Sequence, residues 1–187
     1  MRHRPSRRRC AAALCRWVLL LALASGAGAA AAADELLADL DHRLARSSAD
    51  AVNAHLVAQW SAAMAPLNHK TASCELHAVS LATRLSRSHN TAAVQAHGEA
   101  LRAASGSCAR FVLAMATLPE VPRVCGSVSS WGPAQTAREL RRRIAAIDAD
   151  DVLRTTRRGT TCRAAYVYEL ENTRVVVRRG AATPSGR

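Results

Sequence analysis

Hydrophobic residues recur at spacings of three, four and seven along most of this chain, which predicts amphipathic helices. Such stripes occupy residues 36–44, 52–64, 76–85, 94–115 and 137–147. The second stripe consists of Val52, Leu56, Trp60 and Met64, and Pro66 is expected to end its helix. A chain built of such stripes predicts an all-α fold.

The stripe over residues 94–115 is the most regular. Its members are Val94, Leu101, Cys108, Val112 and Met115, at spacings of seven, seven, four and three. This spacing predicts one continuous buried helix. Gly98 and Gly106 would weaken that helix locally or allow a neighbour to approach it closely.

Proline and glycine mark the stretch from Pro119 to Gly132 as the longest irregular segment. Long loops often carry function, and this one holds Cys125 and Trp131. Pro133 suits the first position of the next helix, which is expected to end before Gly159.

The C-terminal segment, residues 160–179, fits two structures. Apolar and small residues recur at helical spacing, whereas the run Val175 to Val177 and the two tyrosines favour a strand. We favour the helix. Residues 180–187, rich in small residues and proline, are expected to be disordered.

The first 33 residues have the pattern of a cleaved export signal. Six arginines and no acidic residue precede a short apolar run, Trp17 to Ala24, and small residues follow up to Ala33. That order is typical of a Sec-type signal peptide. The apolar run is shorter than the roughly 20 residues that span a membrane. The sequence therefore predicts a secreted or periplasmic protein, cleaved after Ala33, without a membrane span.

Removal of this signal lowers the formal net charge from +12 to +6. Lys70 is the only lysine, so arginine supplies nearly all of the positive charge. A GC-rich genome explains this bias most simply. The functional alternative is an anionic surface as partner, and export argues against nucleic acid.

Four cysteines remain after cleavage: Cys74, Cys108, Cys125 and Cys162. An even number in an exported chain indicates two disulfides, with three possible connectivities. We favour Cys74–Cys108, which would join two neighbouring antiparallel helices. Cys125–Cys162 would then attach the long loop to the C-terminal segment.

The spacing of the candidate residues does not favour a catalytic or metal centre. The six histidines of the mature chain lie between His42 and His97, and no two are four residues apart. Cys74 and His77 form a single half-site, whereas a structural zinc takes four ligands. His97 falls on an apolar stripe and is expected to be a hydrogen-bonded core residue. We therefore expect a non-enzymatic protein without cofactor or metal.

An arginine run on the 137–147 helix offers a candidate partner surface. Its side chains are expected to form a solvated face with packed stems, or a docking surface for an acidic partner. A tryptophan beside arginines is typical of interface hot spots. The candidate partner-binding residues are Trp131, Arg138, Arg141 and Arg142.

Together these patterns predict a single all-α domain over residues 34–179. We expect a small up-and-down bundle of four or five helices with two disulfides. The function expected is an exported, non-catalytic binding protein, of the inhibitor or immunity type, with a protein partner in the envelope or outside the cell. A secreted cytokine-like ligand and a small helical periplasmic enzyme are the alternatives.

Overall fold

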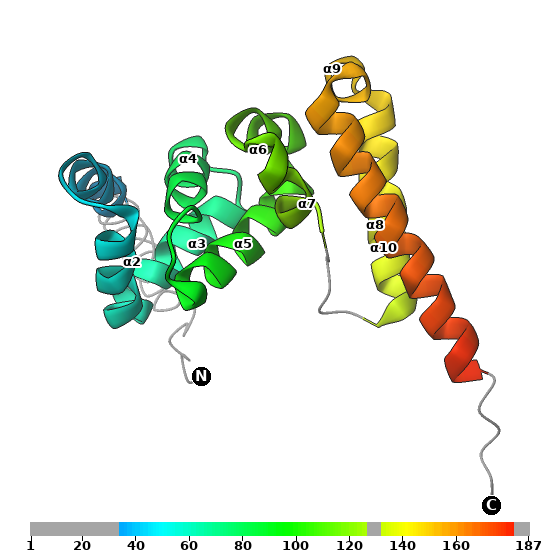
Figure 1. Cartoon of the computed structure of the whole chain (residues 1–187), viewed down its shortest axis with the longest axis horizontal. Helices are drawn as coiled ribbons and strands as arrows, with labels where there is room; N and C mark the ends of the chain where they lie inside the picture. The colour runs from blue at the N-terminus through cyan, green and yellow to red at the C-terminus, as the bar shows by residue number, and fades with distance from the viewer. Residues whose placement is uncertain (1–33, 127–131, 182–187) are drawn as a thin grey trace, which may run out of the picture.

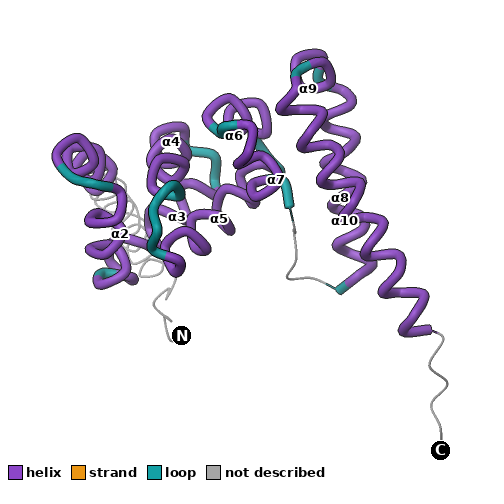
Figure 2. Tube along the Cα trace, viewed as in Figure 1, coloured by secondary structure: helices purple, strands orange, loops and turns teal. Residues whose placement is uncertain are grey.

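The structure, a computed structural model, describes residues 34–126 and 132–181. The predicted export signal, Trp131 and residues 182–187 lie outside the described residues. Every regular element in the described ranges is a helix, and short turns connect them (Figure 2). The all-α class is therefore confirmed. The C-terminal segment is helical rather than a strand, and its helix ends at Ala181.

The helices are shorter and more numerous than the four or five expected, and they follow one another in a row (Figure 1). After a helix over residues 34–46 come α2 (Ala49–Ala58), the π-helical turn η1 (Trp60–Met64), α3 (Ala65–Ala72), α4 (Leu76–Leu85), α5 (Thr91–Ser105), α6 (Ala109–Met115), the 3-10 turn η2 (Leu118–Glu120), α7 (Val121–Val124), α8 (Pro133–Ala149), α9 (Asp151–Thr155) and α10 (Arg157–Ala181).

Pro66 does not end the second stripe, contrary to expectation. It lies in the first turn of α3. A proline is tolerated there because the first backbone N–H groups of a helix have no partner within the helix. Helix η1 therefore continues directly into α3, and only Gln59, with φ of −114° and ψ of 48°, separates α2 from η1.

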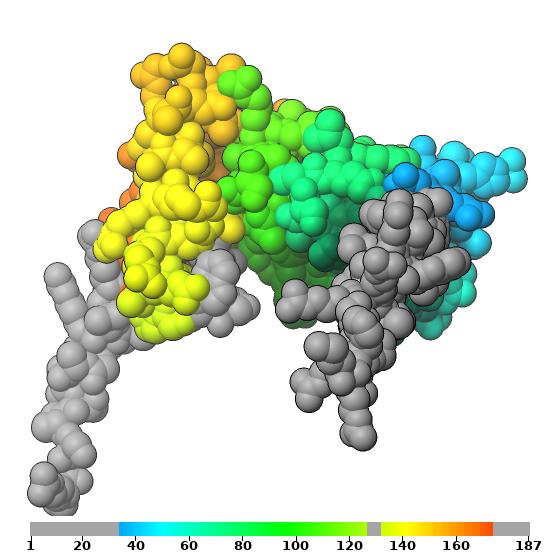
Figure 3. Space-filling view, turned by 180° about the vertical axis from the view of Figure 1, so that it is seen from behind, coloured from blue at the N-terminus to red at the C-terminus, as the bar shows by residue number. Residues whose placement is uncertain are grey.

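Two hydrophobic clusters lie along the row of helices. The N-terminal cluster joins the 34–46 helix, α2, α3 and α4, and its largest buried members are Leu37, Leu40, Leu56, Met64, Leu67, Leu81 and Leu85. The C-terminal cluster joins α4 to α10 and includes Leu101, Leu113, Leu140, Ile147 and Tyr166. Helix α4 contributes to both clusters, and Ala93 of α5 also joins the N-terminal one, so these two helices connect the two parts of the core. Figure 3 shows α8 standing as a column beside the segment from α5 to α7.

Both disulfides have the pairing that we favoured. Cys74–Cys108 joins the turn after α3 to the start of α6, with 6.1 Å between the Cα atoms. Cys125–Cys162 joins the end of α7 to α10, with 5.3 Å between the Cα atoms. The second disulfide is fully buried within the C-terminal cluster. It anchors the α8–α10 hairpin to the rest of the molecule.

Cys74 ends α3 in a left-handed backbone conformation, with φ of 65°. Its N–H donates to the carbonyl of Thr71, and the Glu75 N–H donates to the carbonyl of Lys70, both at 3.0 Å. This pair of bonds is the Schellman motif, whose left-handed position is usually glycine. A cysteine therefore occupies a position that costs an ordinary side chain free energy.

The stripe over residues 94–115 is two helices, not one. Helix α5 ends before Gly106, and Cys108 precedes α6. A Cβ atom on Gly106 would lie 2.7 Å from Nη2 of Arg143, so this glycine allows α8 to approach the turn. The break also changes the register, which leaves Met115 39% exposed.

The segment from Pro119 to Gly132 is partly helical, contrary to expectation. Its first part forms η2 and α7. A capping box stabilises this start, in which the Thr117 N–H donates to Oε2 of Glu120 at 2.6 Å. Residues 127–131 lie outside the described part of the chain.

Helix α8 begins at Pro133, as predicted, but it ends well before Gly159. The Asp150 side chain accepts hydrogen bonds from the N–H groups of Val152 and Leu153, both at 3.0 Å, and so starts α9. Gly159 instead lies in the first turn of α10, where a Cβ atom would collide with the carbonyl of Leu153. Glycine thus permits the tight turn between α9 and α10.

Candidate functional site

A groove of about 600 Å³ lies over α3 and α5, with η1 at its end. Alanines make most of its wall, at positions 65 and 72 of α3 and at positions 92, 96, 100 and 103 of α5. Trp60, Asn68, Gln95 and Glu99 complete it. From the first to the last of its α5 alanines the helix rises roughly 16 Å. The groove is therefore elongated along α5, and its volume is in the range of ligand sites, about 300–1,000 Å³.

Trp60 reaches this groove because of the π-helical turn. The Ala65 N–H donates to the carbonyl of Trp60, five residues back, and the Met64 N–H faces the carbonyl of Gln59 at 3.5 Å. The wider turn rotates Trp60 off the stripe that buries Leu56 and Met64. Trp60 is 48% exposed, whereas Met64 is fully buried. The expectation that Trp60 belongs to the buried stripe is wrong, and π-turns of this kind are frequent at functional sites.

His97 lies behind the groove and is fully buried, as expected. Its Nε2 atom lies 3.0 Å from Oδ1 of Asn53. The Asn53 amide nitrogen donates to the Leu85 carbonyl at 2.9 Å and to Oγ of Ser88 at 2.7 Å, so the amide oxygen must face His97. Nε2 therefore carries a proton. Burial lowers the pKa of His97 from 6.5 to about 4, so the ring is neutral at pH 7.

The same bonding assigns the orientation of the Asn68 amide. Nδ1 of His97 lies 2.9 Å from the Asn68 amide atom placed as Oδ1, but the oxygen and nitrogen of an amide are distinguished only by their hydrogen bonds. A neutral ring protonated on Nε2 can only accept at Nδ1, so the Asn68 nitrogen must donate there at neutral pH. Asn68 is half-buried and lines the groove. Its amide oxygen is then an acceptor available to the groove.

Glu99 is the exposed carboxylate of the groove. Among the described residues its carboxylate has one hydrogen-bond partner, the Gln95 amide nitrogen, which donates to Oε1 at 3.3 Å. The other carboxylates from α2 to the start of α9 all contact a basic side chain: Asp50, Glu75, Glu120, Glu139, Asp148, Asp150 and Asp151. Among the described acids of that segment, Glu99 alone forms no ion pair.

The groove provides acceptors and apolar surface but no acid–base pair. Of the described residues that line it, Glu99 is the only ionisable one. His97 has no exposed surface and lies behind Asn68. General acid–base catalysis needs a group that reaches the substrate directly or through one water. The arrangement is therefore suited to binding.

The predicted partner surface on α8 is separate from this groove. Trp131 lies outside the described residues. Arg138 and Arg141 are exposed, and Arg142 donates from Nε to Oε2 of Glu139 at 2.7 Å. Arg142 and Arg143 together lower the pKa of Glu139 to about 2. Three of the four candidate partner-binding residues are thus on α8. One of them, Arg142, is engaged by Glu139 and also donates to the Gly106 carbonyl at 3.0 Å.

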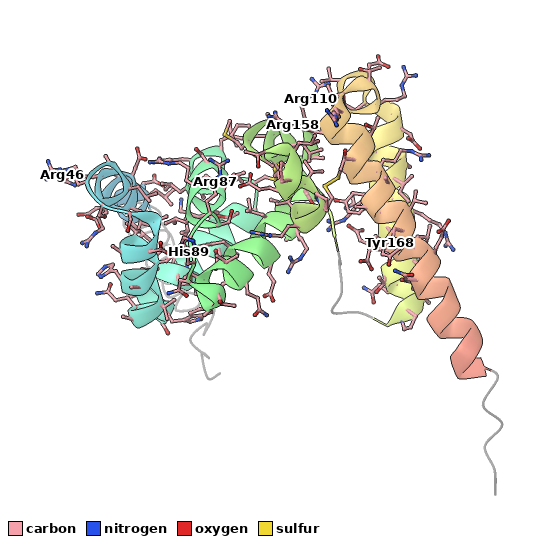
Figure 4. The ribbon with its side chains drawn as sticks, viewed as in Figure 1. Arg46, Arg87, His89, Arg110, Arg158 and Tyr168 are labelled. Carbon is pink, nitrogen blue, oxygen red and sulfur yellow. A yellow bond between two sulfur atoms is a disulfide. The ribbon has the colours of Figure 1, made fainter. Side chains whose placement is uncertain are left out.

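Other exposed cations lie on different elements of the fold. Figure 4 shows Arg46, Arg87 and Arg158 spread along the row of helices. Arg87 pairs with Glu120 at 2.8 Å, and Arg158 donates to the carbonyl of Ala114 at 3.1 Å. These last two cations hold neighbouring helices together.

Sequence reasoning missed the groove residues. Trp60 fits a four-residue stripe, and only the π-turn removes it from that stripe. Asn68 and Glu99 belong to no motif. The available signal was the alanine repeat of α5, from position 92 to position 103, because a helix face of alanines leaves space for a partner.

In the comparisons with known proteins, no family model, no curated protein and no solved structure matches this chain. Within residues 34–126 and 132–181, no three His, Cys, Asp or Glu side chains gather as metal ligands would. None of the helices in those ranges has both the length and the apolar character needed to cross a bilayer.

Proposed function

We propose that this chain is an exported, disulfide-stabilised binding protein without catalytic activity, and that it holds a protein partner in the groove over α3 and α5. The observation that carries this proposal is Trp60, which a π-turn places 48% exposed at the end of an elongated apolar groove. Exposed tryptophans beside such grooves are frequent anchors in protein interfaces.

The arrangement of the cysteines supports export. Two disulfides link segments 34 and 37 residues apart in sequence. Disulfides of this kind persist in oxidising compartments and are rare in the cytosol. Together with the signal-like first 33 residues, they favour a periplasmic or secreted protein of the inhibitor or immunity type.

The lining of the groove favours a binding role. Small side chains on α3 and α5 leave an open trough that an amphipathic helix of a partner could enter, as in other helix-in-groove complexes. The trough offers one carboxylate and no second group to act with it. A partner that fills the groove would be held without being chemically changed.

Affinity capture with a groove-blocked variant tests this proposal. The bait is the oxidised protein in its exported form, incubated with envelope and medium proteins of its source at physiological salt. Ala103→Arg places a long side chain in the groove from an exposed position of α5. Ala145→Arg adds the same side chain at an exposed position of α8 and is the control.

We expect one stoichiometric protein to be captured by the wild type and by Ala145→Arg, and to be lost with Ala103→Arg. Circular dichroism establishes that both variants are folded. Equal capture by all three proteins, or capture of polyanions only, would overturn the proposed role of the groove.

A further inference from the structure

The polar groups of the groove specify what its partner must carry. Glu99 presents a carboxylate without an ion-pair partner, in a chain of formal net charge +12. Asn68 presents an amide oxygen, because Nδ1 of the neutral His97 ring can only accept and so requires the amide nitrogen at this contact. Both residues line the same groove. Two acceptors and a negative charge are complementary to a single cationic donor group.

The shape of the groove specifies the rest of the partner. Alanines recur on α5 at positions 92, 96, 100 and 103 and on α3 at positions 65 and 72, so both walls are low and apolar. The trough extends roughly 16 Å along α5, which is about three turns of helix. A helix with an apolar face fits this length, and Trp60 adds an aromatic surface at the end.

We propose that the groove binds an apolar helical segment of another protein that carries one Lys or Arg on its apolar face, with the cation held by the Glu99 carboxylate and the Asn68 amide oxygen. This inference rests on the proposed function and names the chemistry of the partner. The partner's apolar side chains lie on the alanine walls and against Trp60. The Lys or Arg is the only charge that the partner helix would bury in the groove, and the Glu99 carboxylate neutralises it.

The direction of the Asn68 amide is part of this specificity. Asn53 fixes the proton of His97 on Nε2, and the ring then fixes the donor of Asn68. The groove thus presents an acceptor rather than a donor at this point. A partner with a carboxylate in place of the cation would meet Glu99 and the amide oxygen, both unfavourable.

A panel of three stapled helices of 14 residues tests the proposal. All three have the same Ala and Leu face and differ only at its central position, which is lysine, norleucine or glutamate. Binding of each fluorescently labelled helix to the exported, oxidised protein is measured by anisotropy. We expect the lysine helix to bind about tenfold more tightly than the norleucine helix, and the glutamate helix more weakly than either.

Variants of the protein locate this preference. Glu99→Gln should abolish the advantage of the lysine helix, and Glu99→Lys should make the glutamate helix the preferred one. Glu171→Gln, at an exposed position of α10, removes a carboxylate away from the groove and should leave the order unchanged. Ala103→Arg should weaken the binding of all three helices to a similar extent.

The outcomes separate this inference from the proposed function. If the three helices bind equally tightly and Ala103→Arg still weakens their binding, then the groove binds helices but the proposed cation preference is wrong. If no helix binds while Ala103→Arg still loses the captured partner, the proposed function stands and the inference is overturned.

Two further outcomes would name a different occupant of the groove. Concentration-dependent dimers that Ala103→Arg abolishes would identify a second copy of the chain as the occupant and also overturn the inference. Tighter binding of a peptide of residues 13–24 than of the lysine helix would do the same, because it would assign the groove to the chain's own leader.

Discussion

The guanidinium of Arg143 lies 5.7 Å from the centre of the Tyr166 ring, within the range of a cation–π contact. Arg143 is 7% exposed, and Tyr166 is fully buried. Nη1 of Arg143 donates to the carbonyl of Arg102 at 2.6 Å and to Oγ of Ser105 at 3.2 Å. Nε donates to Oε1 of Glu139 at 2.8 Å. One arginine thus joins α5, α8 and α10.

Arg143 and its neighbour Arg142 should therefore differ in their contribution to stability. We expect Arg143→Met to lower the free energy of unfolding by about 2–3 kcal/mol, because it removes a buried cation with its hydrogen bonds to α5. Arg142→Met removes an exposed ion pair with Glu139 and an exposed hydrogen bond to the Gly106 carbonyl, and should cost only about 1 kcal/mol. Urea unfolding of both variants measures the difference. If both variants lost the same free energy of unfolding, the burial of Arg143 would contribute nothing to stability.

Gly106 should be coupled energetically to Arg143. Because a Cβ atom on Gly106 would lie 2.7 Å from Nη2 of Arg143, Gly106→Ala must displace the guanidinium. We expect the cost of Gly106→Ala to fall by about 1 kcal/mol when Arg143 is already methionine, as measured by a double-mutant cycle. Gly98→Ala is the control, since a Cβ there would have 3.4 Å to its nearest neighbour. Its effect should be the same in both backgrounds.

The buried His97 should make stability depend on pH. Its pKa is lowered from 6.5 to about 4 in the folded protein, so the unfolded chain binds the proton more readily between these values. Stability is therefore fully present above pH 6.5 and declines as the pH falls towards 4. The total loss from this group is about 3 kcal/mol.

Denaturant unfolding between pH 7.5 and pH 4.5 measures this effect. Glu139, whose pKa is lowered from 4.5 to about 2, loses its contribution only below pH 4.5, so the upper range isolates His97. His97→Gln cannot be protonated and should flatten the decline relative to the wild type. Parallel curves for the two proteins would contradict the assignment.

The sequence predicted the helical class and the disulfide pairing because both follow from periodic apolar positions and from helix adjacency. Leu37, Leu40 and Leu56 are buried where the stripes place them. Helix ends were less predictable. Asp150 and Gly159 divide the last third of the chain through a cap and a tight turn, which an apolar pattern does not record.

The candidate site was largely beyond sequence reasoning, for two physical reasons. A single π-turn moved Trp60 from the core to the groove, and such a turn leaves the spacing of apolar residues unchanged. Within the arginine run, burial depends on which side chain faces α5. Arg143 is buried between α5 and α10, whereas the adjacent Arg142 reaches only the Gly106 carbonyl at the end of α5 and stays exposed.

The left-handed conformation of Cys74 can be tested by replacing cysteine with glycine or alanine after each disulfide is removed. Relative to alanine, glycine should raise the free energy of unfolding at position 74 and lower it at position 125. When the Cys74–Cys108 disulfide is removed, position 74 still has φ of 65°, which glycine adopts without the penalty of a Cβ atom. We expect Cys74→Gly with Cys108→Ala to be about 1 kcal/mol more stable than Cys74→Ala with Cys108→Ala.

The matched comparison is at Cys125, where φ is −109° and an ordinary side chain is unstrained. There Cys125→Gly with Cys162→Ala should be less stable than Cys125→Ala with Cys162→Ala, because glycine adds conformational entropy to the unfolded chain and removes a buried methyl group. Urea unfolding of the four double variants gives both differences. If glycine were unfavourable at both positions, the Schellman turn would not persist without its disulfide, and the cross-link itself would be what holds Cys74 in the left-handed region.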